Sequence, residues 1–189
     1  MQRVADIVFW LAIMLWFALS VVGGVAAMAI FPAARELPLS MAGYESFIAA
    51  EPVLGRQLVA GFLVERVFDL AQQPRVVLAA IAVAALAVRL ALSQRAKSVE
   101  PLRGLRIAAI VGAVASVGVS FAALEGFRGA DARYRALAAD ASTRAQAIEA
   151  KTEVDRTHAF ASRVATAEVL SLLAAAMLTA AAAGARRSA

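Results

Sequence analysis

The feature that most constrains this chain is an uncharged run of 28 residues, from position 7 to position 34. A helix that crosses a bilayer needs about 20 predominantly apolar residues. Three similar stretches follow, so we place four spans at about 7–31, 75–94, 107–125 and 164–185. The chain is therefore predicted to be an all-α membrane protein in which four transmembrane helices form a bundle, as one membrane domain over residues 1–189.

The composition agrees with this class. Hydrophobic residues make up 62% of the chain and charged residues 17%, whereas soluble domains carry about 25% charged residues. The chain has no cysteine and one histidine, which excludes disulfides and thiolate metal sites and leaves no reason to expect a metal or a cofactor. The net charge of +5 is explained by basic residues that flank spans, so we expect no nucleic-acid partner. Abundant Ala and Arg with little Lys indicates a bacterial source.

The first span resembles a secretory signal peptide in one respect, because Ala27-Met28-Ala29 is typical of a cleavage site. The apolar run before it exceeds the 7–15 residues usual in a signal peptide, however. We interpret the run as an uncleaved span that ends at Phe31-Pro32.

The segment 35–73 mixes acidic and basic residues, and its second part is predicted to be an amphipathic helix at about 52–73. Its uncharged core, 57–64, has only eight residues, which is too short to span. Such a helix lies at the membrane interface or caps the bundle. Within it, Glu65 and Asp69 are like charges at i, i+4, for which Arg66 and Arg75 are the expected neutralising partners.

A second long segment, 126–163, follows the third span, which Gly126 and Gly129 are expected to end. From 130 to 183 the chain has neither Gly nor Pro. We predict a long helical segment at about 130–163 that continues into the last span and packs on 35–73. A hairpin within 130–163 is the alternative, although it lacks a turn signal.

Basic residues set the expected orientation. The short loop 93–106 is densely basic, Arg3 precedes the first span, and Arg186-Arg187 follow the last. Short basic loops favour the cytoplasmic side. We therefore predict a multi-pass inner-membrane protein with both termini in the cytoplasm, and a helical extracytoplasmic cap made of 35–73 and 126–163.

Glu168 is the candidate functional residue with the clearest rationale, because it lies inside the fourth apolar stretch. Ionisable groups within spans are costly and often functional. The residue could pair with Arg75 or Arg163, anchor the helix at the interface, or form a proton or cation site. A further ion pair between Asp6 and Arg89 is expected at the inner face.

Small residues give a second pattern. Gly112, Ser116 and Ser120 recur at four-residue spacing in the third span, and Gly24 lies in the first. Small residues at this spacing let helix backbones approach closely in lipid, so all four are predicted to be helix-packing positions.

His158, the single histidine, shares a helix face with Asp155 and Ser162 at i, i+3, i+7 spacing. The set superficially resembles a hydrolase triad, but residues on one rigid helix rarely reach triad geometry, and no nucleophile-elbow glycines accompany it. We expect helix packing or hydrogen bonding and assign no catalytic residue, leaving these three positions and Glu168 as possible functional polar positions.

Two segments carry a resemblance to a known family. They are a first span that ends at Phe31-Pro32 before a segment containing Gly43, and the stretch Arg156-Thr157-His158 with Ser162 leading into the last span. These resemble the transmembrane-205-like family of small four-span membrane proteins, which contain a domain of unknown function.

The family typically shows a leucine–histidine pair, a nearby serine and then an asparagine before its last helix. Here Thr157 stands in place of the leucine, and Thr166 or Glu168 stands where an asparagine would be. The resemblance implies a four-helix membrane bundle of unassigned activity and supplies no catalytic residues.

Three functional hypotheses follow. The first is a non-enzymatic membrane scaffold or complex subunit, which predicts few buried charges and an exposed apolar or small-residue face. The second is a small-solute or ion transporter, which needs a polar path near mid-membrane. The third is a lipid-acting membrane enzyme, with Asp155, His158 and Glu168 converging at the outer interface. Expected partners are membrane lipids and either other proteins or a second copy of the chain.

Overall fold

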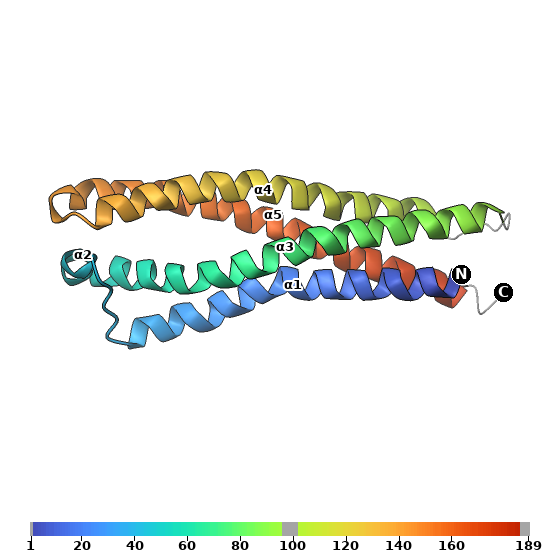
Figure 1. Ribbon diagram of the computed structural model, residues 1–189, viewed down its shortest axis with the longest axis horizontal. Coiled ribbons are helices and arrows are strands. Elements are labelled where there is room, and N and C mark those ends of the chain that lie inside the picture. The colour runs from blue at the N-terminus through green and yellow to red at the C-terminus, as the bar shows by residue number, and fades with distance from the viewer. Residues whose placement is uncertain (1, 96–101, 186–189) are drawn as a thin grey trace. The chain divides into compact units, whose positions relative to one another are not determined.

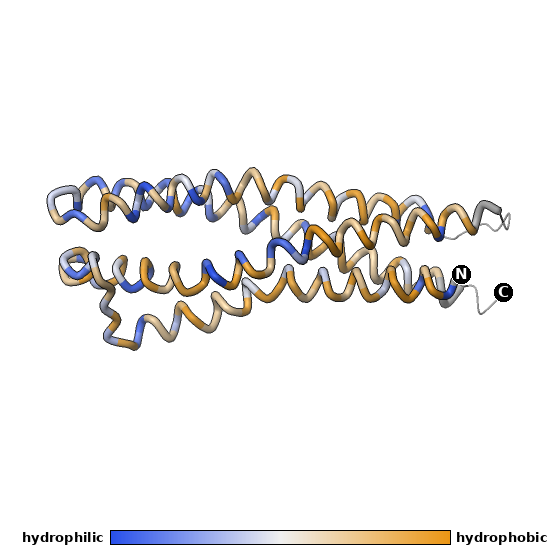
Figure 2. The backbone as a smooth tube through the Cα atoms, in the orientation of Figure 1, coloured by the Kyte–Doolittle hydropathy of each residue, from blue (hydrophilic) through white to orange (hydrophobic). Residues whose placement is uncertain are grey.

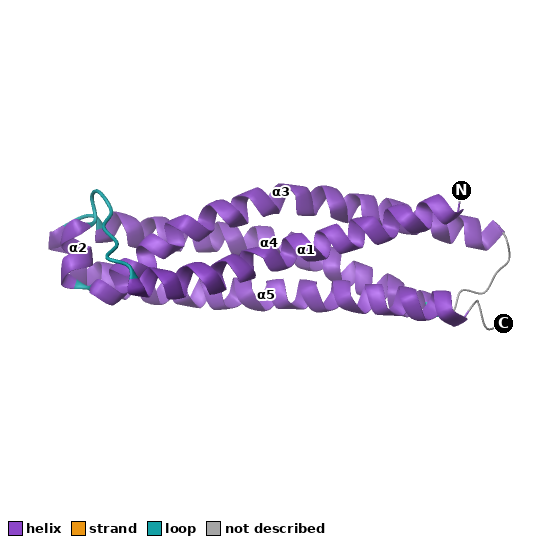
Figure 3. Ribbon diagram, turned by 90° about the horizontal axis from the view of Figure 1, so that it is seen from below, coloured by secondary structure: helices purple, strands orange, loops and turns teal. Residues whose placement is uncertain are grey.

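The computed structural model describes residues 2–95 and 102–185, and in these residues every regular element is a helix (Figure 3). Four helices are long: α1 (Gln2–Glu36), α3 (Pro52–Arg95), α4 (Arg103–Ala138) and α5 (Arg144–Ala185). Two short helices, α2 (Glu45–Ala50) and the 3-10 turn η1 (Ala141–Thr143), complete the order (Figure 1). Each long helix is long and apolar enough to cross a membrane. The chain is therefore an all-α, multi-pass membrane protein.

Residues Lys97 and Glu100 of the predicted basic loop, and the C-terminal Arg186-Arg187, lie outside the described residues.

The described helices divide into two compact units. Unit 1 comprises 1–21, 71–118 and 165–189, and unit 2 comprises 22–70 and 119–164. Colouring by hydropathy separates them too: apolar residues dominate the helical segments of unit 1, and charged residues mix with apolar ones in unit 2 (Figure 2). Unit 1 is the part of the chain with the composition of a membrane interior.

Unit 1 is a four-helix bundle whose core comes from all four long helices. Small residues are prominent in it, so the helices approach closely. The core consists of Phe9, Ala12, Ile13, Trp16, Ala79, Ala82, Ala85, Leu86, Ile110, Ala113, Val117, Leu172, Ala175 and Ala176. Many larger apolar side chains point away from it and are exposed, as expected for helices surrounded by lipid.

Unit 2 has its own core, in which the segment 41–62 packs against 127–154. Phe47 and Tyr134 are each 2% exposed and meet edge to face, with ring centroids 6.0 Å apart. Packing between the two predicted cap segments is therefore present, through α2 and the first turns of α3 on one side and α4 and α5 on the other.

Prolines do not end the helices where the sequence suggested. The first helix continues through Pro32 to Glu36. It ends just before Leu37, where the following residue, Pro38, disfavours helical backbone. Likewise α3 runs unbroken through Pro74, so the predicted separate interfacial helix at 52–73 is wrong. A proline removes one backbone donor, but neighbouring contacts within a bundle can sustain the helix around it.

The segment 130–163 is a hairpin, so the prediction of one helix there is also wrong. The third long helix passes through Gly126 and Gly129 and ends at Ala138. Asp140 then accepts hydrogen bonds from the backbone N–H and the hydroxyl of Ser142, both at 2.8 Å, and these bonds hold the pKa of Asp140 below its usual range. Thr143 Oγ1 donates to the carbonyl of Leu137 at 2.7 Å. The turn thus depends on side-chain caps, without Gly or Pro.

One glycine in unit 2 sets a close approach. A Cβ on Gly55 would lie 2.7 Å from Ile48 Cα, so only glycine lets α3 pack on the backbone of α2. Gly61, six residues further along α3, has nothing within 4 Å of its Cβ position.

We expect Gly55→Ala to lower the midpoint of thermal unfolding in mild detergent, because overpacking against backbone typically costs about 1–3 kcal/mol. Gly61→Ala is the matched control on the same helix. It should leave the midpoint unchanged or raise it, since alanine is favoured over glycine in a helix by up to about 1 kcal/mol. Equal midpoints for the two variants would contradict the close α2–α3 contact.

Candidate functional site

The most polar site inside unit 1 is centred on Glu168 of α5. Its side chain is fully buried, at 0% exposure. The residue occupies a helix that is otherwise uncharged from Val164 to Ala185, and α5 is one of the four candidate spans. A carboxylate in such surroundings is stable only if opposite charge and hydrogen-bond donors surround it.

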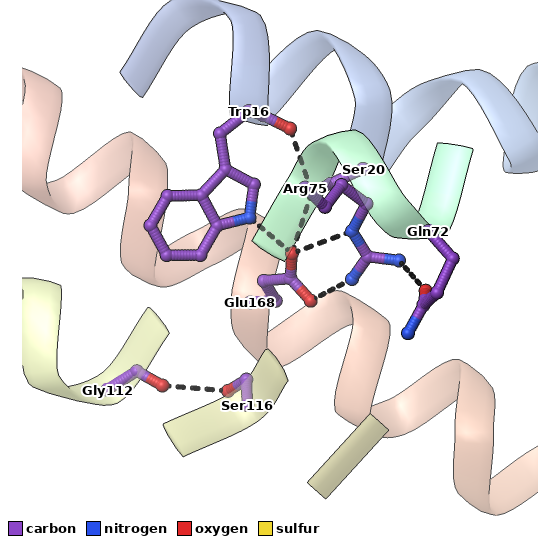
Figure 4. A network of polar contacts seen from close by, with 7 residues as sticks. All are labelled: Trp16, Ser20, Gln72, Arg75, Gly112, Ser116 and Glu168. Atoms are coloured by element: carbon purple, nitrogen blue, oxygen red, sulfur yellow. Dashed lines mark hydrogen bonds and ion pairs between the residues drawn. The ribbon is translucent and has the colours of Figure 1, made fainter. Parts of the chain in front are cut away.

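Two helices, α1 and α3, supply those donors to Glu168 on α5 (Figure 4). Trp16 Nε1 on α1 donates to Glu168 Oε1 at 2.7 Å, and Ser20 Oγ lies 2.8 Å from the same oxygen. From α3, Arg75 Nε donates to Oε1 at 3.2 Å, and Arg75 Nη2 forms an ion pair with Oε2. Two nitrogens of the guanidinium therefore bind the carboxylate, which is the bidentate geometry that makes arginine–carboxylate pairs strong.

The donors are set by helical spacing. Trp16 and Ser20 are four residues apart on α1, so they share one face. Gln72 precedes Arg75 by three residues on α3, and its Oε1 accepts from Arg75 Nη1 at 3.0 Å, which orients the guanidinium toward α5. Pro74 lies between these two residues but does not interrupt the helix.

Ser20 has two acceptors within reach. Its hydroxyl lies 2.9 Å from the Trp16 carbonyl and 2.8 Å from Glu168 Oε1. A hydroxyl carries one proton, so Ser20 donates to one of these oxygens at a time. The carboxylate has Arg75 and Trp16 as donors in either case.

The arrangement holds three helices together, and it is electrically neutral. Of the two cations considered for Glu168, the structure places Arg75, and not Arg163, against it. Protein donors occupy both carboxylate oxygens. The site therefore has the character of a structural ion pair that links α1, α3 and α5.

A second ion pair in unit 1 joins α1 and α3. Arg89 Nε lies 2.8 Å from Asp6 Oδ1, which brings the two expected partners together. The Arg89 guanidinium also lies 5.6 Å from the centre of the Phe9 ring. Ser20 is 14 residues beyond Asp6, and Arg75 is 14 residues before Arg89, so the Glu168 site lies about 21 Å from this pair along both helices.

That distance places the Glu168 site at membrane depth. The hydrocarbon core is about 30 Å thick. If the Asp6–Arg89 pair marks one face, Glu168 lies inside the core, roughly two thirds of the way across. The side chains that satisfy Glu168 are therefore needed, since the lipid supplies no hydrogen bonds at that depth.

Of the small residues predicted to pack in the third span, Gly112 lies at a close contact between helices. A Cβ on Gly112 would lie 3.2 Å from Ser171 Oγ, so α4 and α5 are in close contact there. Ser116 Oγ donates to the Gly112 carbonyl at 2.9 Å. Ser120 is half-buried.

The prediction that Gly24 is a helix-packing position is wrong, because nothing lies within 4 Å of its Cβ position. Its neighbour Gly23 makes the approach instead: a Cβ there would lie 2.5 Å from the ring of Phe68. Adjacent helical residues point about 100° apart, so sequence spacing alone did not distinguish the two glycines.

The predicted polar positions near the start of the last span do not converge. Asp155 forms an ion pair with Lys151, one turn away. His158 is exposed and its ring lies 5.9 Å from that of Phe127, while Ser162 is exposed. Each residue has surroundings of its own, so no triad forms. Across the described residues, no cluster of three or more His, Asp or Glu side chains could hold a metal ion.

One polar cluster in unit 2 was missed. Arg135 pairs with Glu65 at 2.8 Å and with Asp131 at 2.5 Å, and its guanidinium lies 3.7 Å from the centre of the Phe62 ring. Arg128 pairs with Asp69 at 2.8 Å. The cations beside Glu65 and Asp69 thus come from α4. The like-charged i, i+4 pair was the signal that cations were needed, but their source depends on tertiary packing.

Comparison of the chain with protein-family models, with curated proteins and with solved structures found no match. The site therefore has to be interpreted from its own geometry.

We expect Glu168→Gln to destabilise the protein strongly, because it leaves the Arg75 charge without its partner. Removing one member of a buried pair typically costs about 3–5 kcal/mol. The control is Arg128→Gln, which removes a half-exposed pair with Asp69 and should cost about 1 kcal/mol or less. Thermal or SDS-induced unfolding in detergent measures both.

The double variant Glu168→Gln/Arg75→Gln closes the cycle. It should be more stable than the sum of the two single losses predicts, since neither charge is then left alone. If the Glu168→Gln protein were as stable as the unsubstituted chain, the structural role of this carboxylate in the bundle would be contradicted.

Proposed function

We propose that this protein is a non-enzymatic membrane scaffold or a subunit of a membrane complex. The observation that carries the proposal is the engagement of Glu168, whose two oxygens are occupied by Trp16, Ser20 and Arg75. The Glu168 carboxylate therefore serves to hold helices together. In the described part of the chain, the buried charged side chains are Arg89, Arg106 and Glu168, which fits the small number that a scaffold requires.

The transporter alternative has less support. It needs a wet path lined by Glu168 and by serines of the spans. Glu168 is fully buried against Arg75, and Ser116 donates to a backbone carbonyl of its own helix. The enzyme alternative needs Asp155, His158 and Glu168 within about 3 Å of one another, and each of them has other neighbours.

The outward face of α4 supports association within the membrane. Gly118, Ala122 and Gly126 recur at four-residue spacing and are exposed, and nothing lies within 4 Å of the Cβ positions of the two glycines. Small residues at this spacing allow a second helix to approach closely in lipid. A partner protein or a second copy of the chain would pack on this face.

The proposed setting is the inner membrane of a bacterium, with both termini in the cytoplasm and unit 2 carrying the extracytoplasmic cap. The basic residues near 93–106 favour this orientation. Membership of the transmembrane-205-like family is proposed on the same footing, and it would add a four-span topology without an assigned activity.

Single cysteines provide a test of the orientation, since the chain has none of its own. We expect Ser142→Cys, in the exposed turn of unit 2, to react with a membrane-impermeant maleimide on intact spheroplasts. Gly104→Cys, at the start of α4, should react only after permeabilisation. The reverse pattern would contradict the proposed orientation, and the unsubstituted chain reports background labelling.

Co-purification tests the scaffold function. We expect a tagged chain, extracted from native membranes in mild detergent, to elute with a stoichiometric partner or as a homo-oligomer. Gly118→Ile/Ala122→Ile should reduce that association by about tenfold or more, because the added side chains prevent close approach. Ala87→Ile, on an exposed apolar position of α3, is the control. A lone monomer from the unsubstituted chain would overturn the proposal.

A further inference from the structure

A cavity of about 180 Å³ lies in unit 2 between the end of α1 and the start of α3. One water needs only about 15 Å³ of such space, so the cavity can hold a larger group. Its lining is half apolar and half polar, with two cations among six residues: Phe31, Ala34, Arg35, Val53, Arg56 and Gln57.

The two arginines of this cavity are not neutralised by the protein. Within the described residues, neither Arg35 nor Arg56 forms an ion pair, although Glu36 and Glu51 lie close to them in sequence. Arg56 Nε is buried and has no hydrogen-bond partner. A buried donor left unsatisfied costs free energy, and the simplest way to recover it is an acceptor that enters the cavity.

The backbone of the wall has a mixed effect on charge. The first turn of α3, which begins at Pro52, carries a partial positive charge, and the last turn of α1, which ends at Glu36, carries a partial negative one. The preference for an anion therefore comes from the two guanidinium groups. Guanidinium groups bind phosphate oxygens through paired N–H donors. Gln57 adds an amide that can donate. Together these groups match a phosphate-bearing anion.

The position along α1 connects the cavity to the membrane surface. The uncharged run 7–34 ends directly before Arg35. The first charged residues after an apolar span typically lie at the level of the headgroups. We therefore place Arg35 at headgroup level, with Phe31 and Ala34 on the membrane side of it.

We propose that this cavity binds the phosphate of an anionic phospholipid headgroup, with Arg35 and Arg56 as its ligands and Phe31 and Val53 beside its glycerol and first acyl carbons. The chemistry recognised is a phosphate monoanion, which free phosphate shares. The inference does not depend on the proposed scaffold function, because it concerns a different unit and a different measurement.

Native mass spectrometry of the full chain in detergent tests the proposal. The probes are dioleoyl phosphatidylglycerol, dioleoyl phosphatidylcholine and inorganic phosphate. We expect phosphatidylglycerol to bind at least about tenfold more tightly than phosphatidylcholine, because both carry the same phosphodiester but the two guanidinium groups repel the choline cation. Arg35→Gln/Arg56→Gln should abolish this preference. Arg144→Gln/Arg156→Gln, on the exposed part of α5, should keep the preference.

A second variant guards against loss of folding. Val53→Trp fills the cavity from an exposed rim position, 62% exposed, and leaves both charges in place. It should weaken phosphatidylglycerol binding as well. If millimolar phosphate displaces phosphatidylglycerol, free phosphate is the ligand of the cavity. If phosphate does not displace it, the lipid is the ligand. A preference for phosphatidylglycerol that survives in both Val53→Trp and Arg35→Gln/Arg56→Gln would overturn the proposal.

Discussion

The interaction on which the membrane part depends is the contact between Glu168 and Arg75. A carboxylate alone in hydrocarbon would take up a proton or draw in water. Arg75 supplies the opposite charge, and Trp16 supplies a neutral donor from a third helix. The pair thereby fixes the register of α3 against α5 and of α1 against both. Apolar burial gives little driving force for contact between such helices, because lipid is as apolar as the core. The polar contact provides the specificity.

Unit 2 is also held together by arginine–carboxylate pairs, but its helices are much more highly charged than those of unit 1. Its helices carry many charges, and its core combines aromatic rings with alanines. Arg135 bridges Glu65 and Asp131 and covers the Phe62 ring, so one guanidinium serves two acids and an apolar surface. Gly55 lets α2 approach α3, and the Asp140–Ser142 contacts reverse the chain between α4 and α5. The Gly55 and Asp140–Ser142 contacts join residues that are close in sequence, so single residues decide them.

The sequence predicted more of the spans than of their connections. Uninterrupted apolar runs identified four membrane helices, and their boundaries limited the partners of Glu168 to Arg75 and Arg163. Trp16 and Ser20 were not predicted, because contacts across helices depend on rotation about each axis, which a periodic pattern leaves open. For the same reason, Gly24 was predicted as the packing position that Gly23 in fact occupies. The hairpin was only the alternative to one long helix, because Asp140 and Thr143 make the turn through side-chain hydrogen bonds, whereas Gly and Pro are the usual signals of a turn.

The neutrality of the Glu168–Arg75 pair has an electrical consequence. An isolated charge that moves across the membrane potential gains or loses about 2.3 kcal/mol per 100 mV. A closely spaced pair of opposite charges feels almost no net force from that field, although it lies deep in the bilayer. The pair therefore contributes almost nothing to any response of the bundle to voltage, whereas Glu168→Gln would leave on Arg75 a charge on which the membrane field acts.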